Sequence, residues 1–183
     1  RFNYYLILIM FFYSICQLNA EDFTKVKIET PSEILKQEEF KVLGIQRIVF
    51  GNNVVLNIKK NDVEKDTIIF QINFGGGALS VPKGKEALSH YGQPMFKNGG
   101  LKNTSDKELR AAIAGKNISA HFTVLENSFR INSKTTPKDF ELNLQLCRAK
   151  LINSAFPEEA FANAKASFDS TYKALKTEMP DYF

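Results

Sequence analysis

Histidine and cysteine are the side chains that most often hold metals or act as nucleophiles, and this sequence has few of them. Its 183 residues include two histidines, His90 and His121, and two cysteines, Cys16 and Cys147. Structural zinc sites need about four nitrogen or sulfur ligands at short spacings, and a disulfide framework needs several cysteine pairs. The sequence therefore excludes a zinc finger and a disulfide-stabilised scaffold.

Cys147 has the surroundings of a core residue. It continues an apolar helical pattern formed with Phe140, Leu144 and Leu151. A thiol becomes a nucleophile when a neighbouring base or cation favours the thiolate, and no histidine lies close to Cys147 in the sequence. We interpret Cys147 as a small buried side chain on the inner face of a helix.

Strand patterns occupy the first part of the chain. Residues 46–50 and 54–58 flank a Gly-Asn-Asn turn and predict a hairpin, and residues 67–74 are dense in β-branched and aromatic side chains. Residues 117–125 and 129–132 predict a second hairpin. Residues 21–40 predict an extended lead-in with one helical turn near 32–35.

Helix patterns dominate later. Residues 85–96 predict a helix weakened by Gly92 and Pro94, and Ser105 with Glu108 forms a capping box for a helix to about residue 113. A third helix is predicted from Pro137, with Asp139 as its third residue, to about residue 153. A last helix follows Pro157, with one apolar face formed by Phe161, Ala164, Phe168, Tyr172 and Leu175. The expected fold class is α+β, an antiparallel sheet with helices packed on one face.

Composition and charge describe an ordinary folded domain. Hydrophobic residues make up 44% and charged residues 24% of the chain, which excludes an intrinsically disordered protein. The net charge of +4 comes from well-mixed basic and acidic residues, so a nucleic acid is not an expected partner. The length indicates one main domain.

The first twenty residues have the pattern of an export signal. Arg1 precedes an apolar stretch from Tyr4 to Cys16, and the charged pair Glu21-Asp22 follows Ala20. A basic start, a short apolar segment and a small residue before a polar region are typical of a secretory signal peptide. We therefore expect a secreted or periplasmic protein with a signal peptide at 1–20, a lead-in at 21–40 and a domain at 41–183. An uncleaved membrane anchor is the alternative.

Several of these features together resemble a known family. The segment Ile113 to Asn117 (IAGKN), the strand pair after it, the run 133–146 (SKTTPKDFELNLQL) and the run 156–161 (FPEEAF) are similar to one repeat of the insulinase/pitrilysin zinc metallopeptidases. The similarity is greatest to the first repeat of their C-terminal, non-zinc-binding half, and it covers residues 30 to 175. The resemblance implies an α/β roll that forms part of a chamber closing on a peptide.

The same resemblance implies where the family holds zinc, namely on an inverted H-x-x-E-H helix. The corresponding residues here are His90, Gln93 and Pro94, so the first histidine is present while the general base and the second histidine are missing. His121 is the only other imidazole, and Glu158 and Glu159 lie at an ordinary helix start. We expect no catalytic residue and no metal or other cofactor in this chain, with His90 as a weak metal candidate. Zinc is expected on a partner domain or chain.

A run of three glycines, Gly75, Gly76 and Gly77, follows the strand at 67–74. It matches no phosphate-binding fingerprint, and we interpret it as a turn with the backbone freedom that only glycine offers. In the family context these glycines are also weak candidates for substrate binding, because a peptide can add to a sheet edge there.

Three functions follow from these observations. The first is a non-catalytic, exported domain that supports proteolysis by a zinc-bearing partner of the same family and helps to hold a peptide substrate. The second is a free-standing exported peptide-binding or scaffold module. The third is an active metallopeptidase, which the residues at His90, Gln93 and Pro94 favour least.

Overall fold

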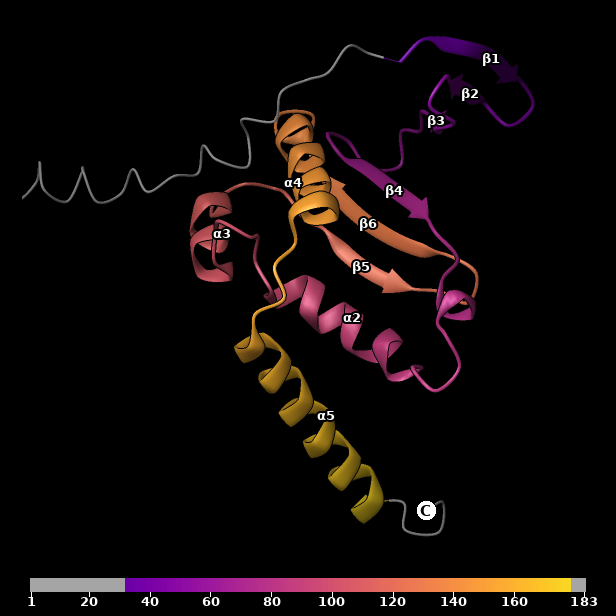
Figure 1. Ribbon diagram of the computed structural model, residues 1–183. Helices are drawn as coiled ribbons and strands as arrows, with labels where there is room; N and C mark the ends of the chain where they lie inside the picture. The colour runs from indigo at the N-terminus through magenta and orange to yellow at the C-terminus, as the bar shows by residue number, and fades with distance from the viewer. Residues whose placement is uncertain (1–31, 179–183) are drawn as a thin grey trace, which may run out of the picture. The chain divides into compact units, whose positions relative to one another are not determined.

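The computed structural model describes residues 32–178 and divides this part of the chain into two compact units, with the division between Thr67 and Ile68. Each unit contains one three-stranded antiparallel sheet, and the helices follow in the second unit (Figure 1). The α+β fold class is confirmed, with two small sheets in place of the one that we predicted. The proposed signal segment at 1–20 lies outside the described residues.

The first unit is a meander of β1 (Ile34–Phe40), β2 (Ile45–Phe50) and β3 (Val55–Lys59). β2 and β3 form the predicted hairpin, and Asn53 takes the left-handed conformation in its turn with φ 64°. The helical turn predicted near residues 32–35 is wrong, because Ile34 and Leu35 begin β1, in which Ile34 pairs with Phe50 of β2. Residues 34–40 are thus a strand of this sheet rather than a separate lead-in.

The second unit is built on β4 (Ile68–Phe74), β5 (His121–Val124) and β6 (Phe129–Thr135), in the order β4-β6-β5. In the register, Ile72 of β4 and Phe122 of β5 both lie opposite Ile131 of β6. Because side chains alternate along a strand, these three residues share one face of the sheet. The other face carries mainly polar side chains, such as Asn73 beside Arg130.

The described part of the second unit has four α-helices, and two of them cover the apolar face. Between β4 and β5 lie α2 (Ala87–Asn98) and α3 (Asp106–Ile113), and after β6 come α4 (Phe140–Asn153) and α5 (Glu158–Glu178). Phe96 of α2 and Cys147 of α4 pack with Ile131 in one core cluster. Leu109 of α3 and Leu146 of α4 belong to a second cluster. Helices on one face of the sheet are therefore confirmed, and Cys147 is in the core as predicted.

The start and the inner face of α4 differ from the prediction. Residues 136–139 form a turn in which the Asp139 N–H bonds the Thr136 carbonyl, and Asp139 is the N-cap instead of the third helical residue. Leu144 and Leu151 of the predicted apolar stripe are exposed, whereas Asn143 and Lys150 are buried. Both polar side chains find hydrogen-bond partners on this face: Asn143 accepts from the Ser119 N–H, and Lys150 donates to the Phe96 carbonyl of α2.

α5 packs along α2 by its first half. Tyr91 of α2 contacts Phe161 and Phe168 of α5, with ring centroids 5.0 and 5.2 Å apart. The helix then continues beyond α2 (Figure 1). Its predicted apolar face is present, but only Ala164 of the five residues is buried. Within residues 32–178 no helix combines the length and the apolar character needed to cross a membrane.

Candidate functional site

α2 carries His90, Gln93 and Pro94, the residues that the sequence resemblance places at the positions of the H-x-x-E-H zinc motif. His90 is exposed and its ring lies 6.3 Å from that of Phe168. Gln93 is exposed, and Pro94 lies inside the helix and is half-buried. Proline has no N–H, so the carbonyl of His90 receives no hydrogen bond from position 94. The helix forms nevertheless, because Met95 and Phe96 bury apolar surface at its end.

The donor set on this helix does not fit a zinc site. A catalytic zinc takes three protein ligands, and the carboxamide of Gln93 and the ring of Pro94 are not among the groups that bind it well. Among residues 32–178, no group of three or more His, Cys, Asp or Glu side chains is placed to hold a metal ion. His90 is a single imidazole on the surface of α2, and one such ligand is too few for a catalytic zinc ion.

The other candidates from the sequence are not brought to His90. His121 begins β5 and lies opposite Asn132, on the polar face of the sheet. Glu158 and Glu159 are exposed in the first turn of α5, where the positive end of the helix dipole favours carboxylates.

The triple glycine lies against the turn that joins β5 and β6. The N–H groups of Ala78 and Leu79, which follow it, donate to the carbonyls of Leu125 and Glu126 at 2.8 and 2.9 Å. Gly77 has φ 62°, and a Cβ there would lie 2.3 Å from the Ser128 nitrogen. This close approach of two backbones accounts for Gly77 as a turn residue. Substrate contact at Gly75–Gly77 stays a prediction.

Burial raises the pKa of the Cys147 thiol to about 11. The side chain has no measurable exposure and lies beside Phe96 and Ile131. A thiol in apolar surroundings is a poor nucleophile, because the reactive thiolate is disfavoured there. Cys147 is thus a packing residue.

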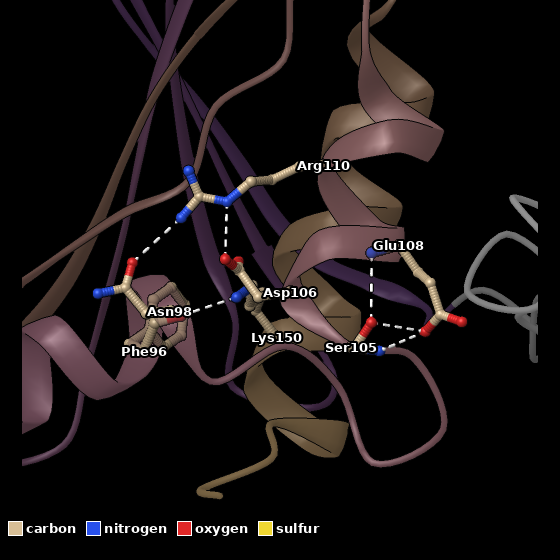
Figure 2. Close-up of polar contacts among 7 residues, drawn as sticks. All are labelled: Phe96, Asn98, Ser105, Asp106, Glu108, Arg110 and Lys150. Atoms are coloured by element: carbon tan, nitrogen blue, oxygen red, sulfur yellow. Dashed lines mark hydrogen bonds and ion pairs between the residues drawn. The ribbon is translucent and has the colours of Figure 1, made fainter. Parts of the chain in front are cut away.

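A cluster of polar side chains joins α2, α3 and α4 (Figure 2). Arg110 donates through Nε to the carboxylate of Asp106 at 2.7 Å and through Nη2 to Asn98 at 3.2 Å. The Nζ of Lys150 donates to the Phe96 carbonyl at 2.7 Å and lies 5.4 Å from the centre of the Phe96 ring. The bond to Phe96 satisfies a carbonyl in the last turn of α2, where a cation is favoured.

The pKa of the Lys150 amine is lowered from its usual value, mainly by burial. The nearby charge of Asp106 opposes this shift, and the charge of Arg110 adds to it. This cluster was not predicted from the sequence. A signal was present, since Lys150 lies three residues after Cys147 and four after Leu146 on the predicted helix. A lysine on that face is a charged group within an apolar pattern.

The fold is shared with proteases of known structure. The chain is similar to the periplasmic protease PqqL from Escherichia coli, with a TM-score of 0.75 and 16% identity over 91% of this chain. The ferredoxin protease FusC, solved in complex with Arabidopsis ferredoxin, gives a TM-score of 0.62 and 7% identity over 82%. A protease from Helicobacter pylori gives 0.51 and 12% over 79%.

These similarities concern one part of each protease. The chain spans 18% of the PqqL chain, 18% of the FusC chain and 31% of the Helicobacter pylori chain. No family model matches the sequence, and the comparison with curated proteins gives no match. At these identities the likeness shows that the fold is shared and nothing further about this chain.

Proposed function

We propose that this chain is an exported, non-catalytic domain of an insulinase/pitrilysin-like zinc metallopeptidase system. In this proposal it forms part of a chamber that holds a peptide, and a zinc-bearing domain or chain of the same family cleaves the peptide. The observation that carries the proposal is a protease fold whose α2 has the residues of an incomplete zinc motif, His90, Gln93 and Pro94.

The chemistry of α2 supports the non-catalytic part. A metallopeptidase uses a carboxylate beside the metal to take a proton from the attacking water. Gln93 is an amide and takes no proton at neutral pH, and Pro94 has no side-chain donor. A domain with these residues needs the metal and the base from elsewhere.

The exposed apolar side chains of α5 support a partner domain. Phe161, Phe168 and Tyr172 are 44%, 38% and 54% exposed, and they follow one face of the helix. An apolar stripe of this kind is typical of a surface that packs against another protein or domain. The chain spans less than a fifth of the PqqL and FusC chains, which leaves room for such domains in a related assembly.

Export is proposed from the pattern of residues 1–20, and the periplasmic location of PqqL supports the same compartment. A fusion of residues 1–25 to a reporter that is active only outside the cytoplasm tests it. We expect the reporter to be exported and the leader to be removed near Ala20. Retention of the reporter in the cytoplasm would contradict export.

The central experiment combines metal analysis with a peptide cleavage assay. The purified chain is analysed for zinc by mass spectrometry and incubated with a quenched fluorescent, unstructured peptide, with and without 1,10-phenanthroline. We expect less than 0.1 zinc per chain, on the order of contamination, and no chelator-sensitive cleavage.

A second arm searches the neighbouring genes for a chain with an intact H-x-x-E-H motif and adds that chain to the assay. We expect a stable complex on size-exclusion chromatography and faster cleavage than with that chain alone. Stoichiometric zinc with chelator-sensitive cleavage by the present chain alone would overturn the proposal. A complex that leaves the cleavage rate unchanged would favour the scaffold function.

A further inference from the structure

A second site lies away from the motif of α2. A cavity of about 150 Å³ opens between α3, α4 and the start of β5. Its apolar walls come from Leu109, Ile113, Ala120 and Leu146. A cavity of this volume in a protein can hold a benzene-sized molecule of about six heavy atoms. The space is therefore suited to a short aliphatic group.

The buried amine of Lys150 also lines this cavity, and its hydrogen bonding is incomplete. The residue is 6% exposed, and with the residues from 32 to 178 its Nζ makes one hydrogen bond, to the Phe96 carbonyl. An ammonium has three N–H donors, so two remain. Among residues 32–178 no carboxylate lies within the 4.0 Å of an ion pair with Lys150.

The charged side chains that line the cavity carry a net positive charge. Arg110 and Asp106 both line it, and their ion pair at 2.7 Å largely cancels their charges (Figure 2). Lys97 of α2 also lines the cavity. Lys150 is left as a buried cation without a counter-ion of its own, and a bound anion would supply one.

We propose that this cavity binds the carboxylate of a short aliphatic group, with the carboxylate on Lys150 and the carbon chain against Leu109, Ile113 and Leu146. The C-terminal residue of a peptide and a free aliphatic acid share this chemistry. The peptide as the source rests on the proposed function, whereas the carboxylate site rests on the cavity alone.

The test is a titration of the wild-type chain followed by ¹⁵N chemical shifts. The ligands are N-acetyl-Ala-Ala-Val with a free C-terminus, the same peptide as its C-terminal amide, and butyrate. We expect the free acids to shift the amide signals of Lys150, Ala120 and their neighbours in a saturable way. The peptide amide, which lacks the charge, binds at least about tenfold more weakly.

Two variants locate the binding group. Lys150→Met keeps an unbranched side chain one atom shorter and removes the charge, and we expect it to weaken binding of the acids by about tenfold or more. Ala120→Val narrows the cavity while keeping Lys150, and we expect it also to weaken binding of the acids. Arg148→Met is the matched control, since Arg148 is exposed on the same helix. It leaves binding unchanged.

The outcomes distinguish the carboxylate site itself from the proposal that a peptide supplies the carboxylate. Binding of the peptide acid and of butyrate identifies the carboxylate site with a peptide as one source, and binding of butyrate alone assigns it to free acids. Neither result depends on a protease partner or on zinc. Saturable binding of the peptide amide with the same affinity as the peptide acid would overturn the site. So would the absence of a saturable shift with both the peptide acid and butyrate, or unchanged affinity in both Lys150→Met and Ala120→Val.

Discussion

Asn143 on α4 accepts a hydrogen bond from the backbone N–H of Ser119, 24 residues earlier in the chain, at an N···O distance of 3.3 Å. Its amide nitrogen donates to the hydroxyl of Ser133 on β6, and that hydroxyl donates to the Ser119 carbonyl at 2.8 Å. Asn143 has no measurable exposure. One buried side chain thus connects α4 to β6 and to the segment that leads into β5.

Replacing Asn143 by alanine is expected to lower the free energy of unfolding by about 2–3 kcal/mol, because the Ser119 N–H loses its acceptor and the Ser133 hydroxyl loses a donor in a buried site. Denaturant unfolding followed by circular dichroism measures it. Asn163→Ala is the control on an exposed position of α5, where we expect a change below about 0.5 kcal/mol. Similar losses in both variants would contradict the role given to Asn143.

Two glycines are expected to respond to alanine in opposite directions. At Gly92 inside α2 a Cβ would meet only the Phe122 ring at 3.6 Å, so Gly92→Ala should stabilise the protein by about 0.5–1 kcal/mol. At Gly77 the positive φ and the backbone of the β5–β6 turn oppose a Cβ, and Gly77→Ala should destabilise it by about 2 kcal/mol or more. Thermal unfolding of both variants tests this, and a shift of the same sign in both would be inconsistent with it.

The Cys147 thiol is expected to be unreactive in the folded protein. With a pKa of about 11, only about one molecule in a thousand carries the thiolate at pH 8. We expect iodoacetamide to label Cys147 in a Cys16→Ser variant only as urea unfolds the chain, with mass spectrometry as the readout. Full labelling in buffer before unfolding would show an accessible thiol.

The same thiol predicts a change of stability at alkaline pH. Folding raises its pKa from the usual 9.0, so the contribution of the neutral thiol to stability is complete below pH 9.0 and is lost as the pH rises through about 11. The difference in denaturant midpoint between the wild type and a Cys147→Ala variant, measured across this pH range, isolates the contribution of the thiol. A difference that stays constant between pH 8 and the alkaline limit would contradict the linkage.

The capping box of α3 predicts a loss of stability in acid. Hydrogen bonds from the Ser105 hydroxyl and N–H lower the pKa of the Glu108 carboxyl from its usual 4.5. The contribution of the carboxylate is therefore complete above pH 4.5 and is lost as the pH falls through the lowered pKa. Glu108→Gln keeps the acceptor without the titration, so the stability advantage of the wild type should shrink below pH 4.5. An advantage that is independent of pH would rule out this origin.

Rebuilding the motif on α2 tests whether this helix corresponds to the zinc helix of the resemblance. In the double variant Gln93→Glu with Pro94→His, the histidines at positions 90 and 94 share one face of α2. We expect it to bind zinc at least about tenfold more tightly than the wild type, measured by competition with a chromogenic chelator. Gln93→Glu alone is the control, with one histidine and no gain. Equal affinity of wild type and double variant would contradict the correspondence.

Local patterns in the sequence determined much of this fold. The hairpin of β2 and β3, the apolar strand β4, the Ser105 capping box and the start of α5 at Glu158 are all where the residue types predict them. Each depends on contacts within a few residues or on a simple periodicity, so the chain near each residue is enough to specify it. The replacement of a base and a ligand by Gln93 and Pro94 is also a property of the sequence alone.

Only the tertiary structure decided which helical faces are buried and where the polar groups meet. Leu144 was expected inside and no burial was expected for Lys150, yet the position of α4 over the sheet buries Lys150 beside Phe96. Asp106 and Arg110 reach the same cavity from α3. These residues lie far apart in the chain, and their proximity depends on how the helices pack across the sheet. Periodicity within one segment contains no information on that packing.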